Sequence, residues 1–426
     1  MTRVDGVVSE AGVLVGVLLP DRPRTGPPLE ELEGLAKTAG VRAVGQLTQR
    51  RHAPDAATYL GKGKVEELKR LAQATDADVV VFDNDLSPGQ TRNLEKALGL
   101  KVLDRTELIL DIFASRAQTY EARLAVELAQ LEYSLPRLKR LWTHLSRQRK
   151  GVGLRGPGEK QLETDRRLVE RRIVELRAEV DAIHRRRERE VAARRDAMTV
   201  SLVGYTNAGK STLLNVLTGA NVKVEDALFA TLDTRTRRWQ LPGWGPVLLS
   251  DTVGFIRDLP HHLIASFRAT LEEARQADLL LHVADGSHPA VIEQTAQAYN
   301  VLEELGIEAK DTLLVVNKID AVSDRSALQG MMNRYPSAIP ISAHRGTGLK
   351  RLSAAVAEAL SRTFLDLDVE LPVENGRLLA YLAVHGEILS KQYGDDRVVV
   401  HCRMPRQFLG RLHHEGAAVR PHPNGQ

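Results

Sequence analysis

Residues 198–212 read MTVSLVGYTNAGKST, and the interpretation of the whole chain depends on this stretch. A short apolar run precedes the spacing G-x-x-x-x-G-K-S, which is typical of a phosphate-binding loop between a strand and a helix. Backbone N–H groups at the start of that helix would surround a polyphosphate. Lys210 would neutralise the β/γ oxygens, and the Ser211 hydroxyl would bind Mg²⁺. A plain strand-turn-helix can carry the same letters, so the rest of the chain decides between the two.

The composition indicates several domains, one of them basic. A chain of 426 residues exceeds one hydrophobic core and suggests about three or four domains. The single cysteine, Cys402, excludes an intramolecular disulfide. There is no apolar run of about 20 residues and no signal-peptide pattern at Met1, so we expect a cytoplasmic protein without a membrane span.

Charge is distributed unevenly along the chain. Residues 117–195 hold 20 Lys+Arg and 12 Asp+Glu, a net +8, so the total of +4 leaves −4 for the remainder. A basic segment on a mildly acidic body indicates a polyanionic partner, although a solvated helix surface is the usual reading of a charge run alone.

Residues 1–116 alternate strand-like and helical patterns, which predicts a small parallel α/β domain. The expected strands are Gly12–Leu19, Val41–Thr48, Asp78–Phe82 and Leu100–Leu103, and the expected helices are Leu29–Thr38, Lys64–Ala74, Ser87–Leu98 and Thr106–Ser115. The Gly61-Lys-Gly-Lys64 turn precedes a helix and could contact a phosphate or an RNA backbone. It lacks the full phosphate-loop spacing, which favours a tight structural turn.

Residues 117–196 carry two heptad seams. The first comprises Leu124, Leu128, Leu131, Leu135, Leu138, Trp142 and Leu145, and the second comprises Leu162, Val169, Ile173, Leu176, Val180 and Ile183. Two helices of roughly 30 residues, each about 45 Å long, are expected to form an antiparallel coiled-coil hairpin. Pro136 should interrupt and kink the first helix.

The turn between the two seams is longer and more basic than a helical hairpin requires. It contains four glycines and a proline, and its basic residues are candidates for contacting RNA. These candidates are Arg147, Arg149, Lys150, Arg155 and Lys160. A turn that only improves solubility is the alternative.

Residues 197–363 return to α/β alternation and predict a doubly wound sheet, with ligand loops at the carboxyl ends of its strands. The expected strands are Val200–Val203, Val247–Ser250, Leu279–Val283, Leu313–Val316 and Ile339–Ile341, and helices are expected at Leu263–Ala274 and Val291–Leu305. Residues 364–426 predict a small α+β domain with strands at Leu367–Leu371 and Val398–Cys402. His413 and His414 there lack metal spacing and are expected on the surface.

Two short motifs distinguish GTP from ATP. Asn317-Lys-Ile-Asp320 follows an apolar strand, where the Asp320 carboxylate can accept both N1–H and the N2 amine of guanine. Adenine offers no such pair and would leave a buried charge unsatisfied. Ser342-Ala-His344 follows the next strand and would present a backbone N–H to the guanine O6.

Two further segments suit the γ-phosphate and its metal. Asp251-Thr-Val-Gly254 would hold Mg²⁺ through water and bind the γ-phosphate with the Gly254 N–H. Thr231 would complete the Mg²⁺ shell only when a γ-phosphate is present, which makes its loop a switch. Thr234 is the rival residue, and Thr231 is preferred.

Together these motifs resemble the G1, G3, G4 and G5 motifs of translation-factor-type GTPases. The basic turn Gly-Leu-Arg-Gly-Pro-Gly-Glu-Lys before the GTPase domain, and the Gly-Lys-Gly-Lys turn, resemble the HflX family. The resemblance implies a monomeric GTPase that binds GTP/GDP and Mg²⁺, with the hairpin reaching ribosomal RNA of the 50S large ribosomal subunit. It also implies splitting or rescue of stalled 70S ribosomes. Ribosome assembly, or an RNA-binding silencing factor that uses GTP as an affinity switch, are the alternatives.

Phe255 stands where Ras-type GTPases carry the glutamine that orients the attacking water. Phenylalanine cannot bond water, so we expect slow intrinsic hydrolysis that the ribosome stimulates. The catalytic candidates are Lys210 and Thr231, and the metal candidates are Ser211 and Thr231. The GTP-binding candidates are Gly204, Tyr205, Thr206, Asn207, Ala208, Gly209, Lys210, Ser211, Thr212, Phe229, Ala230, Thr231, Leu232, Asp233, Asp251, Thr252, Val253, Gly254, Asn317, Lys318, Ile319, Asp320, Ser342, Ala343 and His344.

Overall fold

The computed structural model divides into two compact units. It describes residues 10–20, 26–147, 157–193, 197–220, 228–232, 234–242, 244–257, 273–304, 306–307, 312–322, 325–362, 364–405 and 408–422. The first unit comprises Met1–Arg185, Glu225–Asp233 and Gly254–Ala269, and the second comprises Arg186–Val224, Thr234–Val253 and Thr270–Gln426.

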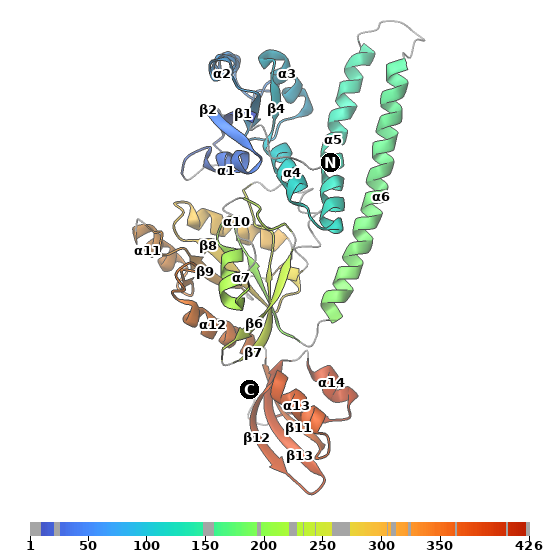
Figure 1. The fold of residues 1–426 in the computed structure, drawn as a ribbon, viewed down its shortest axis with the longest axis vertical. Coiled ribbons are helices and arrows are strands. Elements are labelled where there is room, and N and C mark those ends of the chain that lie inside the picture. The colour runs from blue at the N-terminus through green and yellow to red at the C-terminus, as the bar shows by residue number, and fades with distance from the viewer. Residues whose placement is uncertain are drawn as a thin grey trace, which may run out of the picture. The chain divides into compact units, whose positions relative to one another are not determined.

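The first unit begins with a parallel sheet of four strands in the order β2-β1-β3-β4 (Figure 1). The strands are β1 (Glu10–Leu18), β2 (Val41–Arg50), β3 (Val79–Phe82) and β4 (Lys101–Leu103). The helices are α1 (Glu30–Thr38), α2 (Lys62–Ala74), α3 (Pro88–Leu98) and α4 (Arg105–Arg116). Every strand and helix predicted here is present. Apolar side chains such as Val13, Leu68 and Phe82 form its core, each fully buried.

Two long helices follow, α5 (Tyr120–Arg147) and α6 (Pro157–Ala193). Seam residues from both helices pack together, among them Leu124, Leu128, Ile173, Leu176 and Val180. Figure 1 shows the two helices side by side. The helix α5 runs through Pro136 without a break, so the predicted interruption is wrong. Tyr133 and Arg137, on either side of the proline, both bond Asp104, which holds the helix together across it.

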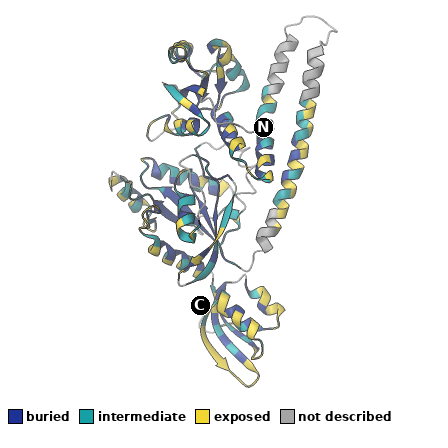
Figure 2. Cartoon of the chain, in the orientation of Figure 1, coloured by how far each residue is buried: buried dark blue, intermediate teal, exposed yellow. Residues whose placement is uncertain are grey.

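The second unit contains a six-stranded sheet in the order β10-β9-β8-β5-β7-β6. The strands are β5 (Thr199–Val203), β6 (Arg235–Leu241), β7 (Gly245–Asp251), β8 (Leu279–Asp285), β9 (Thr312–Asn317) and β10 (Ile339–Pro340). The helices are α7 (Lys210–Thr218), α10 (Val291–Glu304), α11 (Arg325–Arg334) and α12 (Leu349–Ser361). Figure 2 shows that the central strands are buried. All five predicted strands are present, and the predicted helix Leu263–Ala274 lies largely outside the described residues.

The antiparallel strand β6 is the one member of this sheet that the sequence reading missed. Its charged run Arg235-Thr-Arg-Arg238 hides the apolar alternation, since only Trp239 and Leu241 are buried. It pairs with β7 at the sheet edge, where a strand can expose most of its side chains.

The chain ends in an antiparallel sheet in the order β12-β13-β11-β14. Its elements are β11 (Phe364–Pro372), α13 (Gly376–His385), β12 (Glu387–Tyr393), β13 (Arg397–Pro405), α14 (Leu409–His414) and β14 (Ala418–Pro421). The two predicted strands became β11 and β13, whereas the exposed edge strands β12 and β14 were missed. His413 and His414 are exposed, as expected. Among the residues described, no helix combines the length and apolar character that a bilayer span requires.

Candidate nucleotide-binding site

The phosphate-type loop joins β5 to α7 in the second unit, and its two glycines are required by its geometry. Gly204 has φ +141°, and a Cβ there would lie 2.1 Å from the backbone oxygen of Val283. Gly209 has φ +91° and would clash with the side-chain amide of Asn317. Only glycine tolerates these backbone angles in such close contact. The loop therefore has the tight path, ending at a helix N-terminus, that binds polyphosphates.

Lys210 begins α7 and points back over the loop. Its Nζ donates to the backbone oxygens of Gly204 at 3.0 Å and Tyr205 at 2.8 Å. Burial of the ammonium group lowers the pKa of Lys210 to about 8. A buried cation held at the mouth of the loop suits phosphate oxygens, whose charge would stabilise the protonated form.

Ser211 and Asp251 bring two hard oxygen ligands together beside the loop. The Ser211 hydroxyl donates to Asp251 Oδ2 at 2.6 Å, and Asp251 is fully buried at the end of β7. The next residue, Thr252, anchors this strand end by donating to the Leu202 backbone oxygen at 2.7 Å. A hydroxyl beside a carboxylate, next to a phosphate-type loop, fits the oxygen ligands that Mg²⁺ prefers.

Asn317 connects the two motifs predicted to bind guanine, Asn317–Asp320 and Ser342–His344, to the phosphate-type loop. Its side-chain amide donates to the Ala208 backbone oxygen at 2.9 Å, and its side-chain oxygen accepts from the Ala343 N–H at 2.9 Å. The residue is only 2 % exposed. Three chain segments that are more than 100 residues apart at their extremes therefore meet through one side chain.

The two motifs predicted to bind guanine are held to each other by hydrogen bonds. The Ser342 side chain bonds Asp320 and lowers the pKa of that carboxyl group, which keeps it ionised. The Ile319 N–H donates to the Ile341 backbone oxygen at 3.2 Å, and His344 is exposed at the end of the motif. An ionised carboxylate in this position can accept two N–H groups from a guanine edge.

Asp285 and Gln297 contact predicted site residues and were not themselves predicted. Lys318 has a left-handed backbone (φ 60°), and its Nζ lies 2.8 Å from Asp285 Oδ2 at the end of β8. The Tyr205 hydroxyl donates to Gln297 Oε1 on α10 at 2.7 Å. Asp285 could have been found because it closely follows the predicted strand Leu279–Val283, at the carboxyl edge of the sheet. Gln297 carries no comparable signal.

The remaining nucleotide candidates lie in two places. Thr206, Asn207 and Thr212 lie with the phosphate-type loop in the second unit, as does Val253. Phe229, Ala230, Thr231, Leu232 and Gly254 belong to the first unit, and Asp233 lies outside the described residues. That Thr231 completes a magnesium shell with Ser211 therefore stays a prediction.

Of the RNA-contact candidates, Arg149, Lys150 and Arg155 lie outside the described residues. Arg147 ends α5, and Lys160 lies in the first turn of α6. The Gly61–Lys64 turn is the other place where the sequence allows contact with RNA or phosphate. There the Gly61 N–H donates to Gln49 Oε1 at 3.0 Å, which supports a tight structural turn.

The C-terminal sheet places two histidines beside two aspartates. His401 Nε2 lies 2.6 Å from Asp366, His422 Nδ1 lies 2.9 Å from Asp368, and the imidazole rings stack at 3.7 Å. Nitrogen lone pairs lie in the ring planes, so two stacked rings cannot both point at one ion without turning. Each imidazole also has its own carboxylate partner. The cluster is therefore better explained as paired hydrogen bonds than as a metal centre.

Comparison with known proteins gives three family models along the chain. They are described as "GTP-binding GTPase N-terminal" (residues 27–114), "GTP-binding GTPase Middle Region" (116–194) and "50S ribosome-binding GTPase" (199–318). The curated relatives include the GTPase HflX of Magnetococcus marinus, 47% identical over 91% of this chain and 90% of that protein. The GTPase HflX of Escherichia coli is 46% identical over 88% of this chain and 89% of that protein.

Among solved structures, one similar protein is a GTP-binding protein of Sulfolobus solfataricus in complex with GDP. It is 24% identical, with a TM-score of 0.43, over 82% of this chain and 99% of that chain.

Proposed function

The chain belongs to the HflX family of GTPases, and from this membership we propose that it binds the large ribosomal subunit and splits or rescues stalled ribosomes. One observation carries the proposal. In this chain a long basic helical hairpin is followed directly by a segment with the motifs of a guanine-nucleotide site. That segment holds 20 Lys+Arg against 12 Asp+Glu between residues 117 and 195. Such an excess suits a phosphate backbone. The family model matched at residues 199–318, described as "50S ribosome-binding GTPase", adds support.

Guanine nucleotide and Mg²⁺ are the proposed cofactors. Ser211 and Thr231 would bind the ion directly and Asp251 through water, which is consistent with the 2.6 Å Ser211–Asp251 hydrogen bond. The ion would neutralise charge on the transferred phosphoryl group. Lys210 would hold the phosphates, and Asp320 would hold the guanine edge.

Phe255 cannot orient the water that attacks the γ-phosphate. This side chain is only 2 % exposed, and a buried phenyl ring neither donates nor accepts a hydrogen bond. Slow hydrolysis in the free protein follows from this, with the ribosome supplying the missing group. Arg147, Arg149, Lys150, Arg155 and Lys160 are the proposed contacts to ribosomal RNA.

The test is sedimentation of purified 70S ribosomes with the protein and GTP, a non-hydrolysable GTP analogue or GDP. Separated subunits with GTP and with the analogue, but not with GDP, are the expected result. Lys210→Ala should abolish separation. Lys350→Ala, an exposed lysine on α12, is the matched control and should leave it intact. A 70S peak unchanged with all three nucleotides would exclude the splitting role.

The same experiment separates the alternatives. A silencing factor that uses GTP as an affinity switch would bind ribosomes without separating them, and Lys210→Ala would alter only binding. An assembly GTPase would bind precursor subunits in preference to mature ones. We place the protein in the cytoplasm as a monomer, divided into residues 1–116, 117–196, 197–363 and 364–426.

A further inference from the structure

Two loops that belong to the GTPase segment of the sequence pack on the N-terminal part of the first unit. The Leu228 N–H donates to Thr38 Oγ1 on α1 at 3.3 Å. The neighbouring Phe229 meets Phe113 of α4 edge to face, with ring centroids 4.6 Å apart. These residues belong to the loop that carries Thr231. The loop expected to sense the γ-phosphate is therefore seated on α1 and α4.

Phe229 adopts a strained conformation in this position. Its φ is +56°, in the left-handed region that bulky side chains avoid, and it is only 1 % exposed. Such a conformation persists only where the surroundings fix it. The contact with Phe113 is one such constraint, and it links the loop conformation to α4.

The second loop, Gly254–Arg257, is held at its end by a group of four charges, of which Arg105 and Asp83 are buried and Glu31 and Arg257 are half-buried. Arg105 Nη2 donates to the Arg257 backbone oxygen at 3.1 Å. Arg257 Nη2 donates to Asp83 Oδ2 at 3.1 Å, and the Arg257 N–H donates to Glu31 Oε1 at 3.3 Å. Arg105 also pairs with Asp83 at 2.6 Å and with Glu31. Two arginines and two carboxylates bring equal and opposite charge to this group, so the loss of one member would upset its charge balance.

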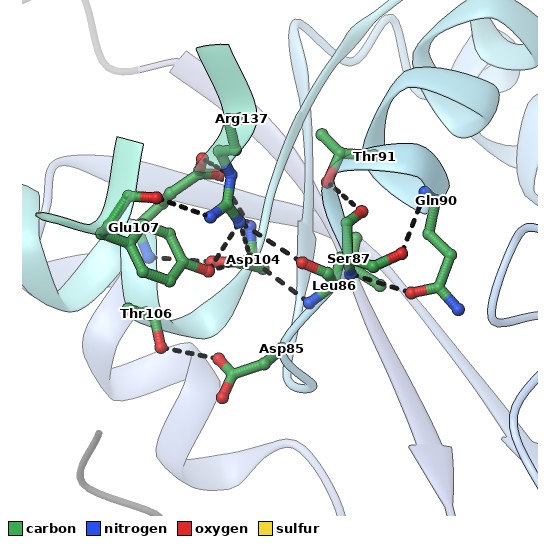
Figure 3. Close-up of polar contacts among 10 residues, drawn as sticks. Asp85, Leu86, Ser87, Gln90, Thr91, Asp104, Thr106, Glu107 and Arg137 are labelled. Carbon is green, nitrogen blue, oxygen red and sulfur yellow. Dashed lines mark hydrogen bonds and ion pairs between the residues drawn. The ribbon is translucent and has the colours of Figure 1, made fainter. Parts of the chain in front are cut away.

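Arg105 is the first residue of α4, and its predecessor Asp104 points to the hairpin. Asp104 accepts hydrogen bonds from Arg137 Nη2 at 2.6 Å and from the Tyr133 hydroxyl, both on α5. Arg137 Nε also pairs with Glu107 Oε1 at 3.1 Å. Figure 3 shows the Arg137 guanidinium between Asp104 and Glu107. Asp104 is fully buried, so this contact is shielded from water.

Asp104 and Arg105 are consecutive, yet their side chains bond two different parts of the chain. Asp104 binds the hairpin helix α5, and Arg105 binds the backbone four residues after Val253. Asp104 is the N-cap of α4 and Arg105 is its first residue, so a shift of this helix start moves both side chains together. The capping box formed by Asp104 and Glu107 fixes this end of α4 further.

We propose that Arg105 is a positioning residue for GTP hydrolysis, and that Asp104–Arg105 transmits movement of the hairpin to the Gly254–Arg257 loop. Contact of the hairpin with RNA would shift Tyr133 and Arg137, and through α4 would reset the loop that follows Asp251. This inference rests on the proposed function, because it names the route by which a bound subunit raises the hydrolysis rate.

The test uses the full chain and compares two arginine substitutions on the hairpin. Arg137→Gln removes the bond to Asp104. Arg177→Gln, the matched control, removes a hairpin ion pair with Glu132 (2.8 Å) that involves no residue of α4. GTP hydrolysis is measured with and without purified large subunits, and subunit binding is measured by pelleting.

We expect Arg137→Gln to bind subunits normally and to keep its basal kcat and its KM for GTP within about twofold. Its subunit-stimulated kcat should fall about fivefold or more. Arg137→Lys should recover part of the stimulation, and Arg177→Gln should keep all of it. Normal stimulation in Arg137→Gln would overturn the inference, as would an equal loss in Arg177→Gln.

A second variant tests the other side of the junction and separates a positioning role from a structural one. Arg105→Lys keeps the buried positive charge but cannot bond Asp83, Glu31 and the Arg257 carbonyl together. A lower stimulated kcat at unchanged KM and unchanged melting temperature is expected; an unchanged kcat would overturn the role of Arg105. If the unmodified protein neither binds subunits nor is stimulated by them, the proposed function fails instead.

Discussion

The side-chain amide of Asn317 donates to the backbone oxygen of Ala208 at 2.9 Å, so the guanine-type motif is bonded directly to the phosphate-type loop. Asn317→Ala would leave two buried backbone groups without this partner, at a cost of about 1–3 kcal/mol. Calorimetric titration with GDP should show a Kd at least about fivefold higher. Asn333→Ala, at an exposed asparagine whose side chain bonds Gln329, is the control. Unchanged GDP affinity in Asn317→Ala would contradict the bracing role.

We expect the Asp320 carboxylate to determine the preference for guanine over other bases. Asp320→Asn replaces two acceptors with one acceptor and one donor, which suits the N1–H and the C2 carbonyl of xanthine and not the guanine edge. We expect GTP affinity to fall about a hundredfold while XTP affinity rises, measured by competition with a fluorescent nucleotide. Asp285→Asn, whose carboxylate pairs with Lys318, should not favour XTP. A variant that still prefers GTP would show that Asp320 does not contact the base.

Lys210 predicts that nucleotide affinity depends on pH. Burial lowers its pKa to about 8, and phosphate charge would raise that pKa in the complex. Binding therefore takes up a proton at higher pH, so the GDP affinity is full below pH 8 and falls as pH rises above it. Calorimetry in two buffers of different ionisation enthalpy should detect this proton uptake near pH 8.5. No proton uptake would mean that Lys210 stays protonated throughout.

The sequence was sufficient for elements with a strong period and for motifs at strand ends. The parallel strands around the phosphate-type loop are largely apolar and bounded by turns, which is why β5, β8 and β9 were predicted. The edge strands β6, β12 and β14 bury few or none of their residues and carry charges, so no alternation marks them. Edge pairing depends on a neighbouring strand, and that information is absent from the local sequence.

In the candidate site, too, some residues could be predicted from the sequence and others could not. Lys210, Ser211, Asp251 and Asn317 could be predicted because each has a fixed place relative to a strand or to the loop. The seating of Phe229 on Phe113, and of Arg257 on Arg105, could not. These contacts join residues more than 100 positions apart, and neither partner belongs to a spacing motif. Pro136 was misjudged for a related reason, because its helix is held by contacts with Asp104 from a distant segment.

Gly204 predicts a strict requirement for glycine. Gly204→Ala would force a side chain into a backbone at φ +141° and place its Cβ 2.1 Å from the Val283 oxygen. The loop would have to move away from β8, and we expect GDP binding to be lost together with about 2 kcal/mol or more of stability. Gly330→Ala on α11, where a Cβ meets open space, should leave both unchanged. Thermal melting with and without GDP measures both effects.

The contribution of Glu107 to the free energy of unfolding is expected to fall as pH rises, whereas that of a carboxylate with a lowered pKa rises with pH. Burial, with the neighbouring Asp104 charge, raises the pKa of Glu107 from its ordinary 4.5 to about 7. The folded protein therefore holds this proton more tightly than the unfolded chain does. The stabilisation is complete below pH 4.5 and is lost as pH rises towards 7, with a limit of about 3 kcal/mol.

Glu107→Gln removes this titration while keeping an oxygen that can accept the Asp104 N–H. The wild type should therefore lose stability relative to Glu107→Gln between pH 4.5 and pH 7. Urea unfolding followed by pulsed hydrogen exchange of the α4 amides would report on this region of a multidomain chain, where a single global transition is not expected. If the stability difference between the two proteins were the same at both pH values, Glu107 would be ionised throughout. Arg137 would then outweigh burial at the junction between α4 and the hairpin.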